Sequence, residues 1–545
     1  MSESAAQRGA NVKTNMNWRV QMGEYTGSRQ VLASCLVFFL SVASCFEGCA
    51  QMLDGPATEK TYGSGLPRDH AKQLFRDEDY PVFALKPGQE AYQDINGPRM
   101  KNDIRALSRI ALNYRDQVNA QWWGIFPGTQ AQTQAVQYMT DEFKRLGLSV
   151  KTVPYQLEKD WRPKSWSASY VSSSGQKIEL KTIFPVSGTK STGDQVLQAE
   201  AIWVGIGSEP DFLGREVKGK AVIVYSNFVP GGRSHSASDR SSLFNANSRA
   251  QALGAAMVIN VMAIPGNGLY QPEDGLKEIP QMTLSQDEGF ALRDRLGRGE
   301  KILLSLKLDV PELKNIQTSY TLSTLPGVSK EEIMLQIHTD GYFQAATDNN
   351  SGMAAGLELA RHYAALPLAK RPRTLVFLTF PDHHHGEVAH YMKGGIDETY
   401  DWKNVALKMT LEHPSETSMY LYNSSLTATN NLSAVRWSAY GSTLFEEMVF
   451  AQLRDFGVPV YALEDPPKNG NFAPSFHIIN HILYHTSLDT PEMVPLEGML
   501  RSVRSFASII DQVNAMSMDQ IRGTQFPPKN PRGSLVGPFK RPSVD

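Results

Sequence analysis

The sequence predicts an α/β fold with a mixed, mostly parallel central sheet flanked by helices and a smaller β-rich domain inserted into it. Three apolar runs of strand length, 333–337, 374–380 and 406–411, carry β-branched and aromatic residues. Between the first two runs, Met353 and Leu357 belong to a pattern with helical spacing. A strand, a helix and a second strand in succession form a crossover between parallel strands, so the centre of the sheet is expected to be parallel.

The helix after the first strand is expected to begin at Asn350 and Ser351, whose side chains can cap its first turn. Earlier in the chain, Gly147 follows a helical pattern and is expected to end that helix in a left-handed conformation.

Imidazoles and carboxylates gather where the predicted strands end. They are His338, Asp340, Asp348, Asp382, His383, His384 and Glu412, with His485 directly after the apolar run 482–484. Open α/β sheets bind ligands beyond the carboxyl ends of their strands. Imidazoles and carboxylates that converge from separate strands are what a zinc site needs. All three cysteines lie in the first 50 residues, so a metal elsewhere must be held by His, Asp and Glu.

Length and charge set limits on the molecule. At 545 residues the chain is too long for a single core and predicts at least two domains. The net charge of -2 gives no nucleic-acid footprint, so no nucleic-acid partner is expected.

Residues 1–50 are predicted to be a signal peptide or lipoprotein signal. Arg19 and Arg29 precede the apolar run 31–45, which has the length of a signal core and is short for a membrane span. Residues 42–45, Val-Ala-Ser-Cys, resemble a lipobox that would place a lipid on Cys45; plain cleavage near residue 50 or a retained anchor are the alternatives. We expect an exported protein, either a cell-envelope lipoprotein, periplasmic or secreted, whose only membrane contact is this N-terminal lipid or anchor.

Composition divides the remaining chain. The predicted parts are an extension at 51–100, the main domain at 101–156 and 313–515, the insert at 157–312 and a disordered tail at 516–545. The insert combines short strands, Gly, Ser and Pro turns, and one clear helix at 242–254.

Four motifs follow one another in order. They are His338-Thr339-Asp340 after a strand, Asp348-Asn349-Asn350-Ser351-Gly352 opening a helix, Glu412 after a strand, and Tyr484-His485 followed by Asp489-Thr490. By these motifs residues 100–515 resemble the co-catalytic zinc aminopeptidase and glutamate carboxypeptidase-like metallopeptidases with an inserted protease-associated domain. The resemblance implies the zinc exopeptidase fold for the main domain.

One motif of this family is altered. The family has Glu-Glu-x-Gly after the next strand, where the first Glu is the general base and the second binds metal. An ungapped alignment places His383 and His384 on these positions, and a one-residue slip would place Asp382 and His383 there. At Glu412 the family more often has Asp.

The resemblance implies a cage for two zinc ions. Asp348 would bridge both ions, His338 and Glu412 would complete one, and His384 and His485 the other. Hydroxide bound to both ions would then attack a peptide bond.

The resemblance also implies supporting roles. Asp340, counted with the catalytic residues, would orient His338, and Tyr484 would contact the substrate. His383 is the candidate general base, so we expect activity to fall below about pH 6.5.

The function that this resemblance implies is an exported zinc-dependent exopeptidase acting on peptide substrates, in first place an aminopeptidase. The family also contains carboxypeptidases and glutaminyl cyclases, so the direction of attack stays open. The alternative is a degenerate member, a metal- or peptide-binding surface protein that kept the cage and lost turnover. Three local alternatives also stay open: residues 383–385 as a solvent-facing tract that holds metal loosely, His413 in place of Glu412, and Asp340 as a turn carboxylate only.

Overall fold

The computed structural model describes most of the chain after residue 74. The described residues are 75–225, 245–273, 275–385, 400–422, 425–463, 473–479 and 482–523. All of them belong to the unit Lys60–Asp545, which is distinct from Met1–Glu59. The predicted signal and Cys45 therefore lie outside the described residues. Among the described helices, none has the length and apolarity needed to span a bilayer.

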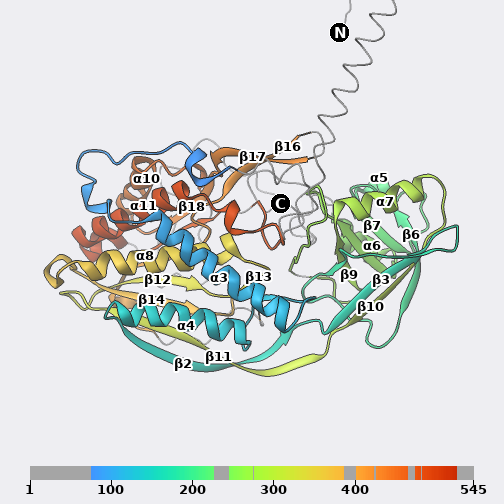
Figure 1. Ribbon diagram of the computed structural model, residues 1–545, viewed down its shortest axis with the longest axis horizontal. Coiled ribbons are helices and arrows are strands. Elements are labelled where there is room, and N and C mark those ends of the chain that lie inside the picture. Colours follow the sequence, from blue (N-terminus) through green and yellow to red (C-terminus); the bar gives the residue numbers. More distant parts are fainter. Residues whose placement is uncertain are drawn as a thin grey trace, which may run out of the picture. The chain divides into compact units, whose positions relative to one another are not determined.

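The main sheet is mixed and parallel at its centre (Figure 1). Its strands, in order across the sheet, are β19 (Val460–Leu463), β18 (Val435–Tyr440), β20 (Ser475–Ile479), β15 (Val405–Thr410), β12 (Glu332–His338), β14 (Thr374–Phe380), β11 (Glu312–Leu325) and β2 (Ser149–Trp161). The neighbours from β20 to β14 pair in parallel, and β11 and β2 close one edge in antiparallel pairing. The predicted mixed α/β fold is confirmed.

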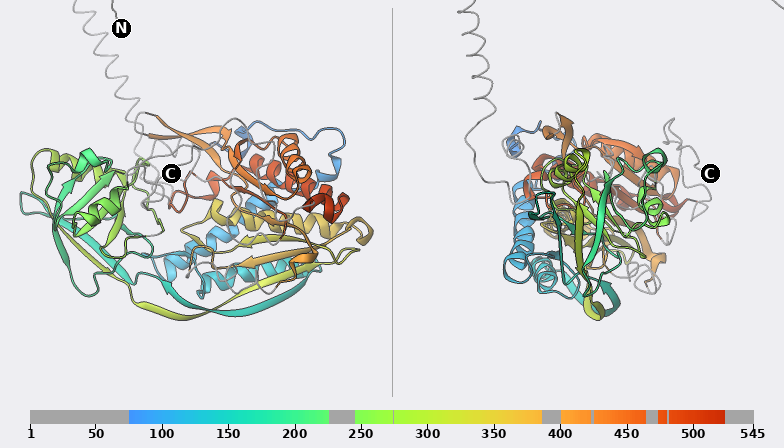
Figure 2. Two further views of the ribbon diagram at one scale, coloured as in Figure 1. Left: turned by 180° about the vertical axis from the view of Figure 1, so that it is seen from behind. Right: turned by 90° about the vertical axis from the view of Figure 1, so that its right-hand side faces the viewer.

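Alternation along the central strands buries both faces of this sheet. In β12, Ile333 and Leu335 face the larger core, whereas Met334 faces a second cluster with Trp402. The helices packed in the larger core are α3 (Gly97–Gln117), α4 (Gln130–Arg145), α8 (Gly352–Ala365), α10 (Thr443–Asp455) and α11 (Leu496–Ala515). Figure 2 shows α3 and α4 side by side in both views, as their contacts require.

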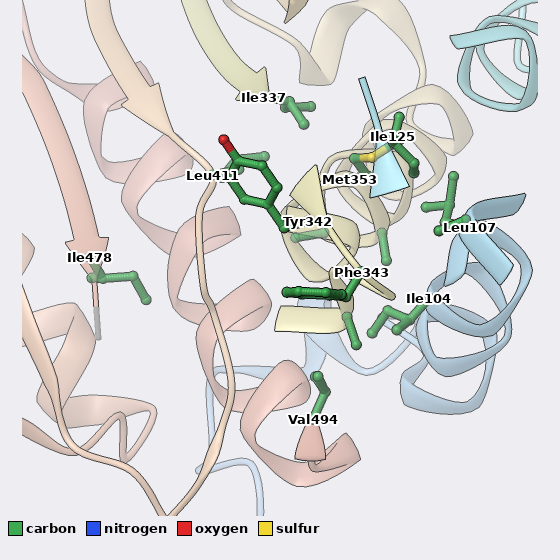
Figure 3. Packing of buried hydrophobic residues seen from close by; sticks show 14 of the residues in the cluster. Ile104, Leu107, Ile125, Ile337, Tyr342, Phe343, Met353, Leu411, Ile478 and Val494 are labelled. Carbon is green, nitrogen blue, oxygen red and sulfur yellow. The ribbon is translucent and has the colours of Figure 1, made fainter. Parts of the chain in front are cut away.

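The same core supports the region just beyond β12. A short antiparallel pair, β1 (Gly124–Ile125) with β13 (Gly341–Tyr342), lies there against α3. Ile104 and Leu107 of α3 pack in one cluster with Ile125, Phe343 and Met353 (Figure 3). The loop that follows β12 therefore packs against fully buried apolar side chains.

The two predicted helix ends have different outcomes. Gly147 follows α4 with φ of 83°, as predicted. The predicted caps of α8 are wrong, because neither side chain bonds the backbone N–H groups of its first turn. A π-helical turn, Ala346–Ser351, precedes α8 instead. Ser351 Oγ donates to the carbonyl of Thr347 at 2.6 Å, and Asn350 Nδ2 donates to that of Gln344 at 2.7 Å, so both side chains hold this turn.

The insert has a sheet of its own. In order, its strands are β4 (Lys177–Glu179), β3 (Ser165–Val171), β10 (Leu303–Asp309), β6 (Leu197–Trp203), β7 (Ala221–Tyr225), β8 (Met257–Val261), β9 (Gln281–Leu284) and β5 (Phe184–Pro185). Its helices are α5 (Glu209–Phe212), α6 (Ala246–Ala252) and α7 (Gln286–Gly297). The one clear helix expected at 242–254 contains α6. The pattern did not indicate α7, because Leu292 is the one large apolar residue among the buried residues of that helix.

Two long strands connect the sheets. β2 and β11 pair from Ser149 and Thr324 to Trp161 and Glu312 (Figure 1). The predicted boundary between residues 156 and 157 falls inside β2.

The remaining described strands and α-helix are the hairpin β16 (Thr417–Tyr422) with β17 (Ser425–Leu432), which lies between Glu412 and His485 in the chain, and α12 (Met518–Arg522). The range predicted as a disordered tail thus begins with a helix, and its residues from 524 lie outside the described part.

Candidate metal centre

The carboxyl ends of the central strands bring three predicted ligands together. His338 is the last residue of β12, Asp348 lies in the π-helical turn, and Glu412 follows β15. His338 Nε2 is 3.2 Å from Asp348 Oδ1 and 3.7 Å from Glu412 Oε1. All three side chains are buried. These are the residues that the resemblance assigned to one ion.

The second predicted pair meets the same carboxylate. His384 Nε2 lies 3.5 Å from Asp348 Oδ1, and His485 Nε2 lies 3.2 Å from Asp348 Oδ2. Asp348 therefore stands between two sets of imidazoles. This is the position that a carboxylate bridging two cations requires.

Two further residues join the site. His413 Nε2 lies 3.0 Å from Asp348 Oδ1, so the structure places His413 beside Glu412 rather than in its stead. Glu273 of the insert has Oε1 3.0 Å from His384 Nδ1. His413 was among the sequence alternatives, whereas no motif or spacing in the sequence pointed to Glu273.

The His383-His384-His385 tract is not a solvent-facing loop. His384 and His385 are buried, and only His383 is exposed. Asp340 fixes the tract, since its carboxylate oxygens accept from the backbone N–H groups of His383 at 3.2 Å and His384 at 2.7 Å.

Asp340 also contacts His338, as predicted. His338 Nδ1 lies 3.1 Å from the Asp340 carbonyl oxygen and 3.4 Å from its Oδ1. Because a carbonyl oxygen can only accept, Nδ1 of His338 carries the proton. Asp340 thus combines the predicted orienting role with that of a turn carboxylate.

Residues behind the ligands lock their backbones. Asp489 accepts from the N–H groups of Thr347 at 2.8 Å and Asp348 at 3.2 Å. Asn349 Nδ2 donates to the carbonyls of His338 and Leu411, each at 3.1 Å. The bridging position therefore has a rigid frame that ties the ends of β12 and β15 together.

His477 holds one of the candidate ligands. Its Nε2 lies 2.9 Å from Glu412 Oε2, and it therefore orients that carboxylate.

Tyr484 packs on the centre from the side. Its ring stacks on that of His485 with centroids 3.6 Å apart, and the residue is 5% exposed. The stacking holds the His485 imidazole. The contact of Tyr484 with substrate stays a prediction.

The electrostatics of the site follow from its crowding. Burial raises the pKa values of Asp348 and Glu412, but the imidazoles around them outweigh burial and hold both well below the usual range. Burial lowers the pKa of His384, yet the Asp348 and Glu273 carboxylates raise it to about 10.

His383 behaves in the opposite way. Although 32% of its side chain reaches solvent, the protein packed around the His383 ring, together with the neighbouring His338 and His384 rings, lowers its pKa to about 3. The expected fall of activity below about pH 6.5 stays a prediction, and a ring of this pKa would not change its charge near that pH. A base of such low pKa is also weak at neutral pH. The role of His383 as general base stays a prediction that this environment does not favour.

Three imidazoles direct Nε2 at one carboxylate. His338 and His485 have Nδ1 against carbonyl oxygens and His384 has it against Glu273, which leaves Nε2 of each facing Asp348. Among the described residues, His338 Nε2, His485 Nε2 and Asp348 Oδ2 are buried without a hydrogen bond. Each such atom costs on the order of 1–3 kcal/mol. Cations between the imidazoles and the carboxylate would remove this cost, so the donor set fits a metal pair.

Comparison with known proteins shows a likeness in fold. The sequence matches no family model and no curated protein. The peptidase M28 precursor from Shewanella amazonensis superposes with a TM-score of 0.56 and 17% identity, over 81% of this chain and 100% of that one. BSAP, a zinc aminopeptidase from Bacillus subtilis, gives a TM-score of 0.52 and 16% identity, over 79% and 98%. The chain therefore has the zinc exopeptidase fold that its motifs predicted.

Proposed function

We propose that this protein is a zinc-dependent exopeptidase, in first place an aminopeptidase that hydrolyses peptide bonds. The observation that carries the proposal is the place of Asp348, within 3.5 Å of imidazoles from four separate positions of the chain. The likeness in fold to a zinc aminopeptidase supports the same class.

Two ligand groups would hold the metal. His338, Glu412 and His413 would hold one ion, and His384 and His485 the other, with Asp348 shared between them. Zinc bound there supplies Lewis acidity to a water and to a peptide carbonyl oxygen. Asp340 and Asp489 keep this set rigid before any substrate arrives.

His383 lies beside the ligands and reaches solvent, with 32% of its side chain exposed. Its Nε2 lies 3.6 Å from Glu412 Oε1. Its neutral ring can orient a water or a substrate amine by hydrogen bonding. It replaces the carboxylate base of the family with a group of low basicity. This one observation favours the second candidate, a degenerate member that binds metal without turnover.

Metal content and cleavage, measured together, separate the candidates. The full-length protein is assayed for zinc by mass spectrometry and for cleavage of an aminoacyl-nitroanilide panel, with and without chelator. We expect two zinc ions per chain and chelator-sensitive cleavage. Asp348→Asn should lower cleavage on the order of 100-fold or more, whereas the exposed control Glu179→Gln should match the unmodified protein.

The other outcomes are equally informative. Bound zinc without cleavage of any substrate favours the degenerate member and refutes the exopeptidase. Absence of zinc from the unmodified protein refutes both candidates.

A further inference from the structure

A segment of the insert, residues 268–273, lies along the chain directly after Tyr484. The N–H of Gln271 donates to the carbonyl of His485 at 2.9 Å, and the N–H of Ser487 donates to that of Leu269 at 3.0 Å. Tyr270 and Thr486 form an antiparallel bridge between these bonds. The insert is thus hydrogen-bonded to the backbone of a candidate ligand.

An apolar cluster holds this segment in place. Its buried members from the insert are Val186, Met262, Ile264 and Tyr270, and those from the main domain include Ile482, Leu483, Leu488 and Met493. Because both sets belong to one packed cluster, residues 268–273 have a defined position against the metal centre.

Two polar groups of the segment reach the ligands. The Gln271 carbonyl lies 3.1 Å from His485 Nδ1, and Glu273 Oε1 lies 3.0 Å from His384 Nδ1. Both contacts fix the protonated nitrogen and turn Nε2 toward Asp348. Metal-binding histidines commonly donate their second N–H to such a carbonyl or carboxylate, which sets the tautomer and raises the basicity of the ligand.

We propose that Glu273 is a positioning residue of the metal centre, supplied by the inserted domain and acting through His384. Where the family motif has a metal-binding Glu, this chain has His384, and one negative charge is lost beside the ions. The Glu273 carboxylate restores that charge at a greater distance from the ions. It does so through its hydrogen bond with Nδ1 of His384, the ring nitrogen that faces away from Asp348. The inserted domain then completes the centre.

This inference rests on the proposed function only in requiring that the centre bind metal. The test compares Glu273→Gln, which keeps the size and removes the charge, with Glu278→Gln, an exposed glutamate of the same insert. Metal affinity is measured by chelator competition, and the ligand field by the visible spectrum of the cobalt-substituted protein. Neither measurement depends on catalysis.

We expect Glu273→Gln to weaken one of the two ions about 10–100-fold and to shift the cobalt bands. Glu278→Gln should match the unmodified protein in both. Metal-free Glu278→Gln should also unfold at the temperature of the unmodified protein, which controls for a general effect of changing the insert.

Two ions bound with unchanged affinity and an unchanged cobalt spectrum in Glu273→Gln would overturn the inference and leave the proposed function intact. A lowered unfolding temperature of metal-free Glu273→Gln, with unchanged metal affinity, would also overturn it by showing a structural role only. An unmodified protein that binds no metal refutes the proposed function itself.

Discussion

His383 and His384 are adjacent in the sequence, yet their surroundings push their pKa values in opposite directions. Burial lowers both. For His384 the Asp348 and Glu273 carboxylates outweigh burial and raise the pKa to about 10. For His383 the surrounding protein and the His338 and His384 rings outweigh the Glu412 and Asp340 carboxylates, and the pKa falls to about 3. Neighbouring positions in one motif therefore have different chemistry, because the charged groups near them come from distant parts of the chain.

His383→Gln tests this difference. A histidine whose pKa is lowered to about 3 is neutral throughout pH 5–8 and does not change its charge there. The variant should therefore keep the shape of the pH–activity profile between pH 5 and 8, whatever its effect on the maximum. The measurement is kcat/KM for one nitroanilide substrate at half-unit pH steps.

A fall of kcat/KM near pH 6.5 that is present in the unmodified protein and absent from His383→Gln would contradict the low pKa of His383. It would restore His383 as a base of ordinary pKa.

At the scale of elements, an ion-pair network joins the three helices beneath the centre. Arg361 of α8 has Nη1 2.6 Å from Asp103 Oδ2 of α3 and Nε 2.6 Å from Glu142 Oε1 of α4. These side chains are at most 16% exposed. The network holds the helices whose apolar sides carry the loop with Asp348.

Glu142→Gln tests how much this network stabilises the fold. The variant should lower the free energy of unfolding at neutral pH, and lower it less in acid. The Arg145 hydrogen bond, together with Arg361 and against burial, lowers the pKa of Glu142 to about 2, from about 4.3 in an unfolded chain. A lowered acid pKa stabilises the fold above the unfolded value, and this contribution is lost as pH falls toward the folded value. The contribution is on the order of 2 kcal/mol, allowing for the exposed Arg145.

Urea unfolding at pH 6 and pH 3 measures it. The difference in unfolding free energy between the unmodified protein and Glu142→Gln should shrink to less than half at the lower pH. The surface variant Glu179→Gln should show no such change. An equal difference at both pH values would show that charge plays no part.

At the scale of the whole molecule, the sequence predicted what depends on local pattern and order. The apolar runs located β12, β14 and β15, and the motifs at their ends named residues that do meet at Asp348. The sequence did not predict what distant pairing creates. Glu273 reaches His384 only because residues 268–273 pair with the chain after Tyr484, and no spacing encodes that contact.

The residue preferences for helix caps also failed at the start of α8. Asn350 and Ser351 look like caps by residue type, but the π-helical turn before α8 uses their side chains for its own carbonyls. This turn carries Asp348 into the site. Residue preferences for helix caps do not include such a requirement of the site.

In the proposed centre, Asp348 is shared by two metal ions. Diffraction from zinc-containing crystals, recorded on both sides of the zinc absorption edge, locates these ions. We expect two anomalous peaks that both contact Asp348, one beside His338 and Glu412 and the other beside His384 and His485. A single peak, or none in contact with Asp348, would refute the shared carboxylate.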